Sequence, residues 1–346
     1  MAETTGPAAD VLPGSDMNAP LLEVEDLRVE FAVRGRRIPA VRGVNFALEQ
    51  GKTLAVVGES GSGKSVTSQA IMGILDSPPG FVTGGEVRLR GVDLLQQDEE
   101  TRRTVRGNHI AIVFQDALSA LNPVWSVGFQ LGELYRVHRG AGRRAAEQKA
   151  IELLDQVGIP DAKNRVGHYP HQFSGGMRQR VMIAMALALD PEVLIADEPT
   201  TALDVTVQAQ IMRLLRRIQD ERNMGLILIT HDLGVVADVA DDVAVMYAGQ
   251  IVERANIHDV FARPAHPYTK ALLRAIPRVD AVGRELEVIP GLPPNPAALP
   301  SGCPFHPRCR AADPERCGDE EPPDRQAAEG HLARCHFAEE VYRDER

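Results

Sequence analysis

The sequence predicts an α/β protein with a parallel β-sheet, followed by a small C-terminal extension. Short continuous apolar runs occur at residues 54–57, 193–196 and 226–229, as expected of strands that are buried on both faces. Helical patterns lie between these runs, and such alternation indicates a parallel sheet with crossover helices. Beyond residue 264 the composition turns rich in Pro, Gly, Cys and Arg, which marks the extension.

Composition and charge narrow the class of protein. The 346 residues carry a formal net charge of −10, which gives no electrostatic footprint for nucleic acid, so none is expected as a partner. No segment approaches the roughly 20 apolar residues that cross a bilayer. Residues 1–20 lack a basic start and an apolar stretch, so we expect a disordered leader there rather than a signal peptide. We therefore expect a cytosolic protein that reaches a membrane through partner chains.

The remaining elements follow from periodicity. Residues 22–33 alternate apolar and polar side chains with one skipped step, and residues 41–48 continue in the same style, as half-buried antiparallel strands do. Residues 116–180 are largely polar and helical in pattern. Helices are expected at residues 66–75, 141–157, 177–189 and 205–222.

A glycine-rich loop joins the first buried strand to the helix that follows it. The loop reads Gly58-Glu59-Ser60-Gly61-Ser62-Gly63-Lys64-Ser65 and is followed by Val66. Glycines let backbone N–H groups surround phosphate oxygens, and the helix N-terminus adds partial positive charge. In this pattern Lys64 pairs with the β- and γ-phosphates of a nucleotide, and the Ser65 hydroxyl binds Mg²⁺. A glycine-rich turn without a ligand is the alternative.

Acidic and imidazole side chains follow the next two buried strands. Asp197 ends one strand, where its carboxylate can reach the same Mg²⁺, and the adjacent Glu198 can act as general base toward water. His231 follows the other strand and could contact the γ-phosphate. Two solvated acids and a structural histidine are the alternatives. The order of these groups along the chain predicts ATP hydrolysis.

A second anion-binding helix start lies at Ser174-Gly175-Gly176, which opens the apolar helix expected at residues 177–189. One nucleotide does not need two phosphate cradles. We therefore expect this one to complete the site of a second subunit, with Asp204 near the same interface. A plain glycine-rich N-cap is the alternative.

With these motifs in order, residues 21–253 resemble the ATP-binding subunit of an ABC transporter. The signature motif of that family stands here as Phe173-Ser174-Gly175-Gly176-Met177, with Gln179 two residues later. The resemblance implies a P-loop ABC-type nucleotide-binding domain with a RecA-like core, an antiparallel β subdomain and a helical subdomain. It also implies that Phe31 stacks on adenine and that Gln115 joins Ser65 and Asp197 at Mg²⁺.

The tail resembles that of dipeptide and oligopeptide importer ATPases, through Phe261-Ala262-Arg263-Pro264-Ala265-His266-Pro267-Tyr268-Thr269 and Ile289-Pro290-Gly291-Leu292-Pro293-Pro294. We therefore expect an ATPase domain over residues 21–260 and a peptide-importer extension over residues 261–346. The resemblance implies a paralogous second ATPase subunit, two permease subunits and an extracytoplasmic solute-binding protein, with this chain peripheral on the cytoplasmic face of the membrane. Import of nickel or another small solute is an alternative, and a non-transport ABC ATPase acting on nucleic acid is another.

All four cysteines lie in this extension, at Cys303, Cys309, Cys317 and Cys335. Four cysteines together in a segment too small for its own core favour a metal staple over disulfides in a cytosolic chain. Their spacing lacks the CxxC pairs common in structural zinc sites and is compatible with an iron–sulfur cluster. The resemblance points the same way, so a structural [4Fe–4S] cluster is expected; Zn²⁺, and thiols that are free or in disulfides, are the alternatives.

Overall fold

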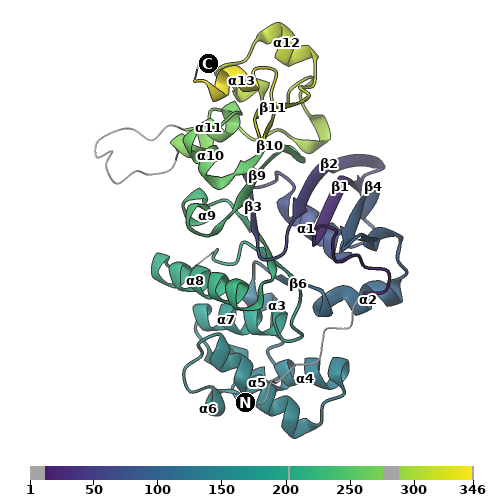
Figure 1. The fold of residues 1–346 in the computed structure, drawn as a ribbon, viewed down its shortest axis with the longest axis vertical. Coiled ribbons are helices and arrows are strands. Elements are labelled where there is room, and N and C mark those ends of the chain that lie inside the picture. Colours follow the sequence, from purple (N-terminus) through teal and green to yellow (C-terminus); the bar gives the residue numbers. More distant parts are fainter. Residues whose placement is uncertain (1–11, 202, 276–287, 345–346) are drawn as a thin grey trace. The chain divides into compact units, whose positions relative to one another are not determined.

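A computed structural model of the chain describes residues 12–201, 203–275 and 288–344. The chain divides into two compact units, and many of their helices and strands are labelled in Figure 1. Among the described residues, we call them the phosphate-loop unit (residues 23–48, 52–88, 228–275 and 288–344) and the helical unit (residues 12–22, 49–51, 89–201 and 203–227). The strand β8 (Gly225–Thr230) has residues in both.

A mixed β-sheet forms the centre of the phosphate-loop unit, with the strand order β11-β12-β10-β9-β3. Strand β3 pairs with β9 in parallel, and Val57 lies opposite Val245. The other neighbours pair antiparallel, so the C-terminal extension continues the sheet that contains β3. The five strands are β3 (Thr53–Val57), β9 (Asp242–Tyr247), β10 (Gln250–Asn256), β11 (Asp324–Ala328) and β12 (His331–Arg334).

A second sheet, which belongs to this unit except for the end residues Leu22 and Leu89, has the order β2-β1-β4. It is formed by β1 (Leu22–Val33), β2 (Arg36–Leu48) and β4 (Gly80–Leu89). The skipped step in the apolar pattern of β1 coincides with Asp26, whose φ of 44° lets Val24 and Leu27 both be buried. Strand β2 begins before the expected residue 41. Arg34 and Gly35 both have positive φ, and a two-residue turn of that kind pairs the strands from its first flanking residues onward.

The helices of this unit are short. The one after the glycine-rich loop, α1 (Lys64–Met72), begins and ends earlier than expected. It ends at Met72 because Gly73, at a φ of 62°, caps its C-terminus. The others are α9 (Leu233–Val239), α10 (Ile257–Ala262), α11 (Pro267–Arg274), α12 (Pro314–Asp319) and α13 (Ala338–Tyr342).

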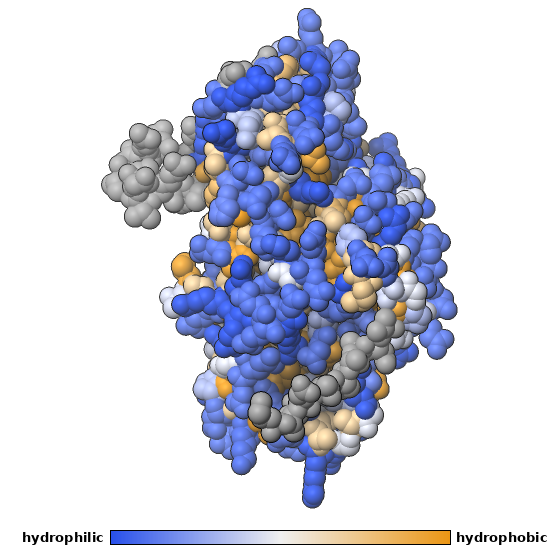
Figure 2. Space-filling model, viewed as in Figure 1, coloured by the Kyte–Doolittle hydropathy of each residue, from blue (hydrophilic) through white to orange (hydrophobic). Residues whose placement is uncertain are grey.

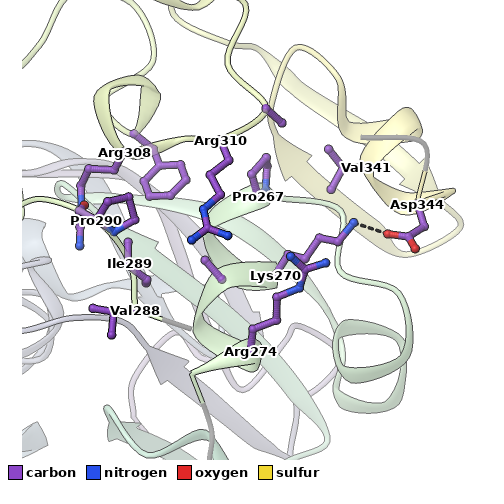
Figure 3. Close-up of a pocket in the computed structure, with 13 residues that line it drawn as sticks. Pro267, Lys270, Arg274, Val288, Ile289, Pro290, Arg308, Arg310, Val341 and Asp344 are labelled. Carbon is purple, nitrogen blue, oxygen red and sulfur yellow. Dashed lines mark hydrogen bonds and ion pairs between the residues drawn. The ribbon is translucent and has the colours of Figure 1, made fainter. Parts of the chain in front are cut away.

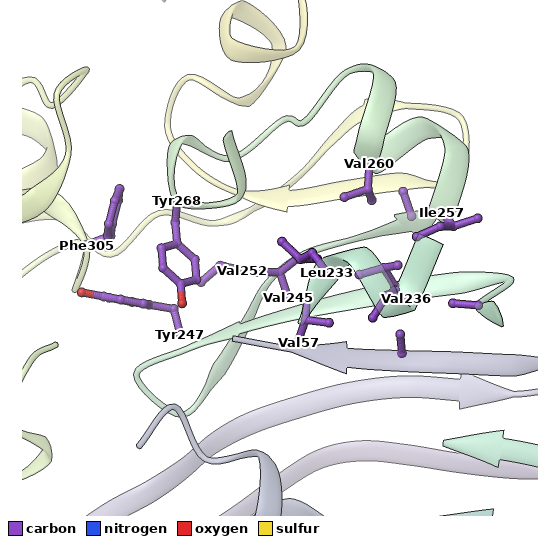
Figure 4. Close-up of a cluster of buried hydrophobic side chains, with 14 residues drawn as sticks. Val57, Leu233, Val236, Val245, Tyr247, Val252, Ile257, Val260, Tyr268 and Phe305 are labelled. Carbon is purple, nitrogen blue, oxygen red and sulfur yellow. The ribbon is translucent and has the colours of Figure 1, made fainter. Parts of the chain in front are cut away.

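One apolar core joins the extension to the strand that leads into the loop. Val57 of β3, Val245 of β9 and Val260 of α10 are fully buried in it, and Phe305 of the extension packs at its end against Tyr247 and Tyr268 (Figure 4). A buried carboxylate adds polar contacts: Glu253 of β10 accepts hydrogen bonds from the backbone N–H groups of Ala265 and His266 and is paired with His331 Nε2 at 2.7 Å. Apolar and polar contacts thus both join the extension to the rest of the phosphate-loop unit.

The helical unit contains two parallel strands and most of the long helices. Strand β6 (Ile110–Val113) pairs with β7 (Val193–Asp197), and Ile112 lies opposite Ile195. The short strand β5 (Val92–Asp93) precedes them. The helices are α2 (Glu99–Asn108), α3 (Ala117–Ala120), α4 (Val127–Arg139), α5 (Arg143–Gln156), α6 (Ala162–Arg165), α7 (Gly175–Ala186) and α8 (Val205–Arg222).

The expected leader is only partly described, since residues 1–11 lie outside the described part of the chain. Within residues 12–20, the chain makes contacts with the rest of the helical unit. Leu12 is buried, and the backbone N–H of Asp16 donates to the carbonyl of Arg90 at 2.8 Å. The expectation of a disordered leader over residues 1–20 stays a prediction.

None of the helices within the described ranges is long and apolar enough to cross a bilayer. On the face drawn in Figure 2, hydrophilic residues predominate and hydrophobic ones occur in small groups.

Candidate functional site

The glycine-rich loop lies between β3 and α1, where a parallel strand meets a helix N-terminus. Two of its glycines are sterically required. A Cβ on Gly58 would lie 2.2 Å from the carbonyl oxygen of Met246, and one on Gly63 would lie 2.7 Å from that of Ala40. Gly63 also has a φ of 107°, which L-residues rarely adopt. The loop can therefore hold its backbone N–H groups in a tight ring only with glycine at these positions.

Lys64 is folded onto the loop. Its side chain is buried, and Nζ donates to the carbonyl oxygens of Gly58 at 2.8 Å and Glu59 at 3.0 Å. The first turn of α1 has no side-chain cap and no acidic residue, so no negative charge within that turn opposes an anion at this helix N-terminus. The buried Ser62 hydroxyl has no hydrogen-bond partner among the described residues. These features fit a phosphate group within the loop.

The other residues expected around the nucleotide have different exposures. Ser60 and Gly61 are exposed at the tip of the loop, while Ser65 and Val66 are half-buried at the start of α1. Phe31, at the end of β1, is also half-buried. His231 follows β8 and is exposed. All of these belong to the phosphate-loop unit.

A second group of expected residues lies in the helical unit, where β7 ends. Asp197 is the last residue of β7 and is buried. Glu198 turns away from the strand with a φ of 46°, and its Oε2 accepts hydrogen bonds from Gln115 Nε2 at 3.1 Å and Thr201 Oγ1 at 2.9 Å. The structure thus brings Gln115 and Glu198 together, as an active centre that uses both would require.

The signature segment begins α7 in the same unit. Ser174 is exposed and caps the helix, with Oγ accepting from the Met177 N–H at 3.4 Å. A Cβ on Gly176 would lie 2.6 Å from Val207, so this glycine also allows α7 to pack against α8. Asp204 is exposed and caps α8 by accepting from the Val207 N–H at 3.0 Å.

Gln179 differs from its neighbours in the signature segment. Only 4% of it is exposed, and its Nε2 has no hydrogen-bond partner among the described residues. It faces the interior of the protein, whereas Ser174 and Gly175 at the helix start are exposed.

The four cysteines line one small cavity in the extension, together with side chains that include His266, His306 and His336. No disulfide joins them, and burial raises the pKa of the Cys335 thiol to about 12. Within the described ranges, no group of three or more His, Cys, Asp or Glu is arranged to hold a metal ion. The structure places the four cysteines around one cavity, and the [4Fe–4S] cluster expected from the sequence stays a proposal.

Comparisons with known proteins agree with the motifs. The family described as "ABC transporter" matches residues 41–201, and "Oligopeptide/dipeptide transporter, C-terminal region" matches residues 252–317. The dipeptide transport ATP-binding protein DppD of Escherichia coli is 49% identical over 317 residues, which cover 92% of this chain and 96% of the relative. The chain belongs to the ABC transporter ATPase family. It is an ATP-hydrolysing subunit of the ABC type, as the order of its motifs predicted.

Two further comparisons concern a relative named for oligopeptide transport and a solved structure with a similar fold. The oligopeptide transport ATP-binding protein OppD of Bacillus subtilis is 53% identical over 286 residues, which cover 82% of this chain and 80% of that one. The ATP-binding cassette MJ0796, solved as a dimer in a post-hydrolysis state with ADP and Pi, aligns with a TM-score of 0.61 and 28% identity. That alignment covers 68% of this chain and 98% of MJ0796. The expected P-loop ABC ATPase fold is confirmed.

Sequence reasoning missed one contact at the phosphate loop. Arg308 of the extension forms a two-point ion pair with Glu59, the second residue of the loop, and 249 positions separate the two. No local pattern signals such a pairing.

Proposed function

We propose that the chain hydrolyses ATP to drive peptide import through separate membrane subunits. The observation that carries this proposal is the presence, in one chain, of an intact phosphate loop and the C-terminal region of the oligopeptide/dipeptide transporter family. Two relatives, 53% and 49% identical in sequence to this chain, are named for oligopeptide and dipeptide transport. The experiment described below distinguishes peptide import from import of nickel or another small solute and from action on nucleic acid.

At the nucleotide, each residue has a role that its position supports. Lys64 leaves the two loop carbonyls and pairs with the β- and γ-phosphates, while the backbone N–H groups of the loop surround them. Ser65, Gln115 and Asp197 would hold Mg²⁺, whose positive charge would offset the negative charge of the phosphates. Glu198 takes a proton from the attacking water, and Gln115 holds the Glu198 carboxylate in place. In this proposal His231 orients the γ-phosphate and Phe31 stacks on the base.

A complete site requires a second ATPase subunit, which we propose is a paralogue. Ser174 and Gly175 are exposed at the N-terminus of α7, a helix of 12 residues whose terminal N–H groups can bind an anion. Asp204 is exposed at the start of α8. In this proposal these groups face the γ-phosphate bound by the phosphate loop of the partner, so that ATP holds the two subunits together.

The membrane partners would dock on the helical unit. Between Gln115 and α4, the chain exposes 70% of Val124 and 49% of Trp125, and the Trp125 ring stacks on Phe129 at 4.4 Å. Exposed aromatic residues of this kind are enriched at protein interfaces. We propose that this surface contacts the two permease subunits on the cytoplasmic face, and that a solute-binding protein delivers the peptide from the other side.

Reconstitution with permeases and binding protein tests this function. ATP hydrolysis in proteoliposomes should rise when a dipeptide or oligopeptide is supplied to the binding protein. Stimulation by Ni²⁺ and not by peptide would support the other solute class. Stimulation by DNA or RNA, with no association with permeases, would contradict the transport function.

We also propose that Cys303, Cys309, Cys317 and Cys335 bind a structural [4Fe–4S] cluster. All four line one cavity, and four thiolates are the donor set that such a cluster needs. Anaerobically purified protein should be brown, with broad absorbance near about 400 nm. Each Cys→Ala variant should lose the colour and become easier to cleave in the extension. One zinc and no iron per chain would contradict the cluster.

A further inference from the structure

The extension contacts the phosphate loop through one arginine. Arg308 Nη1 and Nη2 lie 2.6 Å and 2.9 Å from the two carboxylate oxygens of Glu59, a bidentate geometry. The arginine is 7% exposed and the Glu59 side chain 26% exposed, so solvent screens the pair only in part. This pairing raises the pKa of Arg308, chiefly through the hydrogen bonds to Glu59, and the guanidinium stays charged.

Glu59 is held at three points around the loop. Its side chain pairs with Arg308, its backbone N–H donates to the Tyr268 hydroxyl at 2.9 Å, and its carbonyl accepts from Lys64 Nζ at 3.0 Å. Lys64 is the group that must reach the phosphates. The position of Glu59 therefore sets the position of the carbonyl on which the lysine rests.

Arg308 is itself firmly placed. It ends a short 3₁₀ turn over residues 306–308, and Nε donates to the carbonyl of Pro290 at 2.9 Å. Phe305, just before the turn, is buried with Tyr247 and Tyr268 (Figure 4). Figure 3 shows Arg308 beside Pro290, on the side of a neighbouring pocket away from Lys270. A rigid support of this kind lets a contact in the extension fix the loop.

The charges of Arg308 and Glu59 predict how loss of the arginine changes the affinity for ATP. Without Arg308, the Glu59 carboxylate would remain near a loop whose ligand is a polyphosphate, and like charges repel in a site of reduced dielectric. A loss of affinity for ATP should then depend on the Glu59 charge, and not only on the missing arginine.

We propose that Arg308 is a positioning residue of the nucleotide site, which holds Glu59 and thereby keeps the phosphate loop in the shape that receives ATP. The proposal rests on the ATP-binding role of the loop. It also means that the extension is part of the nucleotide site, and not only a staple beside a complete ATPase.

The test measures the Kd of ATP for the full chain by titration calorimetry. Arg308→Ala should weaken binding by about tenfold, a change of about 1.4 kcal/mol, and Arg308→Lys should lose less because the charge remains. Glu59→Gln should restore part of the affinity when added to Arg308→Ala. Arg334→Ala is the matched control, since Arg334 makes a bidentate pair with Asp324 in the extension, with both distances 2.8 Å.

The outcomes separate the inference from the function on which it rests. If the wild-type chain bound no ATP, the proposed function would fail. If the wild type binds ATP and folded Arg308→Ala binds it equally well, the inference alone is wrong. Equal losses from Arg308→Ala and Arg334→Ala, or no restoration by Glu59→Gln, would indicate general loosening of the extension and would overturn it too. If Arg308→Ala does not fold, Arg308→Lys and the double variant decide by the same criteria.

Discussion

Replacing Glu198 by Gln should separate ATP binding from hydrolysis. The carboxylate receives hydrogen bonds from Gln115 at 3.1 Å and Thr201 at 2.9 Å, and its backbone has a φ of 46°. Glutamine has the same shape and keeps one oxygen acceptor, so the local structure should remain. Its amide cannot take a proton from water, and general-base catalysis contributes about 10²- to 10⁴-fold. The hydrolytic barrier should therefore rise by about 2.7 to 5.4 kcal/mol.

The assay is phosphate release by the assembled transporter, with ATP affinity measured in parallel. Glu198→Gln should bind ATP as the wild type does and lose nearly all turnover. Thr201→Val is the control, because it removes one hydrogen bond to Glu198 and leaves the base, so its loss should be much smaller. Turnover of Glu198→Gln at the wild-type rate would refute the assignment of the general base.

Three further predictions concern the loop, the subunit interface and stability. Lys64→Ala should raise the Kd of ATP by about 10- to 150-fold, the equivalent of about 1.5–3 kcal/mol for a charge-assisted contact; unchanged affinity in calorimetry would contradict the loop assignment. Ser174→Arg should abolish hydrolysis by the paired subunits and leave ATP binding to the single chain intact, and concentration-independent activity of the wild-type monomer would count against the shared site. Glu192→Gln should lower the free energy of unfolding at neutral pH by about 1.5–3 kcal/mol, because the carboxylate pairs with His109 and Arg90, both buried, at 2.9 Å each.

The loss of unfolding free energy in Glu192→Gln should depend on pH. Hydrogen bonds from His109 and then Arg90 lower the pKa of Glu192 below 4.5. A lowered pKa in the folded state stabilises the protein above the unfolded pKa, and the effect is lost as the pH falls through the folded value. The difference between wild type and Glu192→Gln in urea unfolding should therefore shrink below about pH 4.5. A difference that stays constant from pH 7 to pH 3 would contradict this pairing.

The sequence predicted the buried strands and the long helix well, for a simple physical reason. Continuous apolar runs define β3, β7 and β8, and the helix expected between the last two runs, at residues 205–222, is observed as α8 with those bounds, Val205–Arg222. These elements are set by residues close together in the chain. The order of the nucleotide motifs, likewise, was visible because each motif is short.

What the sequence could not predict depends on residues far apart. The burial of Leu12, the two strands that the extension adds to the sheet, and the pairing of Arg308 with Glu59 all join distant segments. Local periodicity carries no information on such contacts. The extension was expected to be an appendage because its composition changes abruptly, yet its backbone pairs with β10 and its arginine pairs with the phosphate loop.

Uptake of a labelled dipeptide is the most direct test of whether this chain hydrolyses ATP to drive peptide import. Proteoliposomes would contain this chain, its partner ATPase and the permeases, with ATP enclosed in the lumen and the binding protein and dipeptide outside. Uptake should require ATP and should be lost when this chain carries Glu198→Gln. Uptake that proceeds equally without ATP, or with the Glu198→Gln chain, would contradict it.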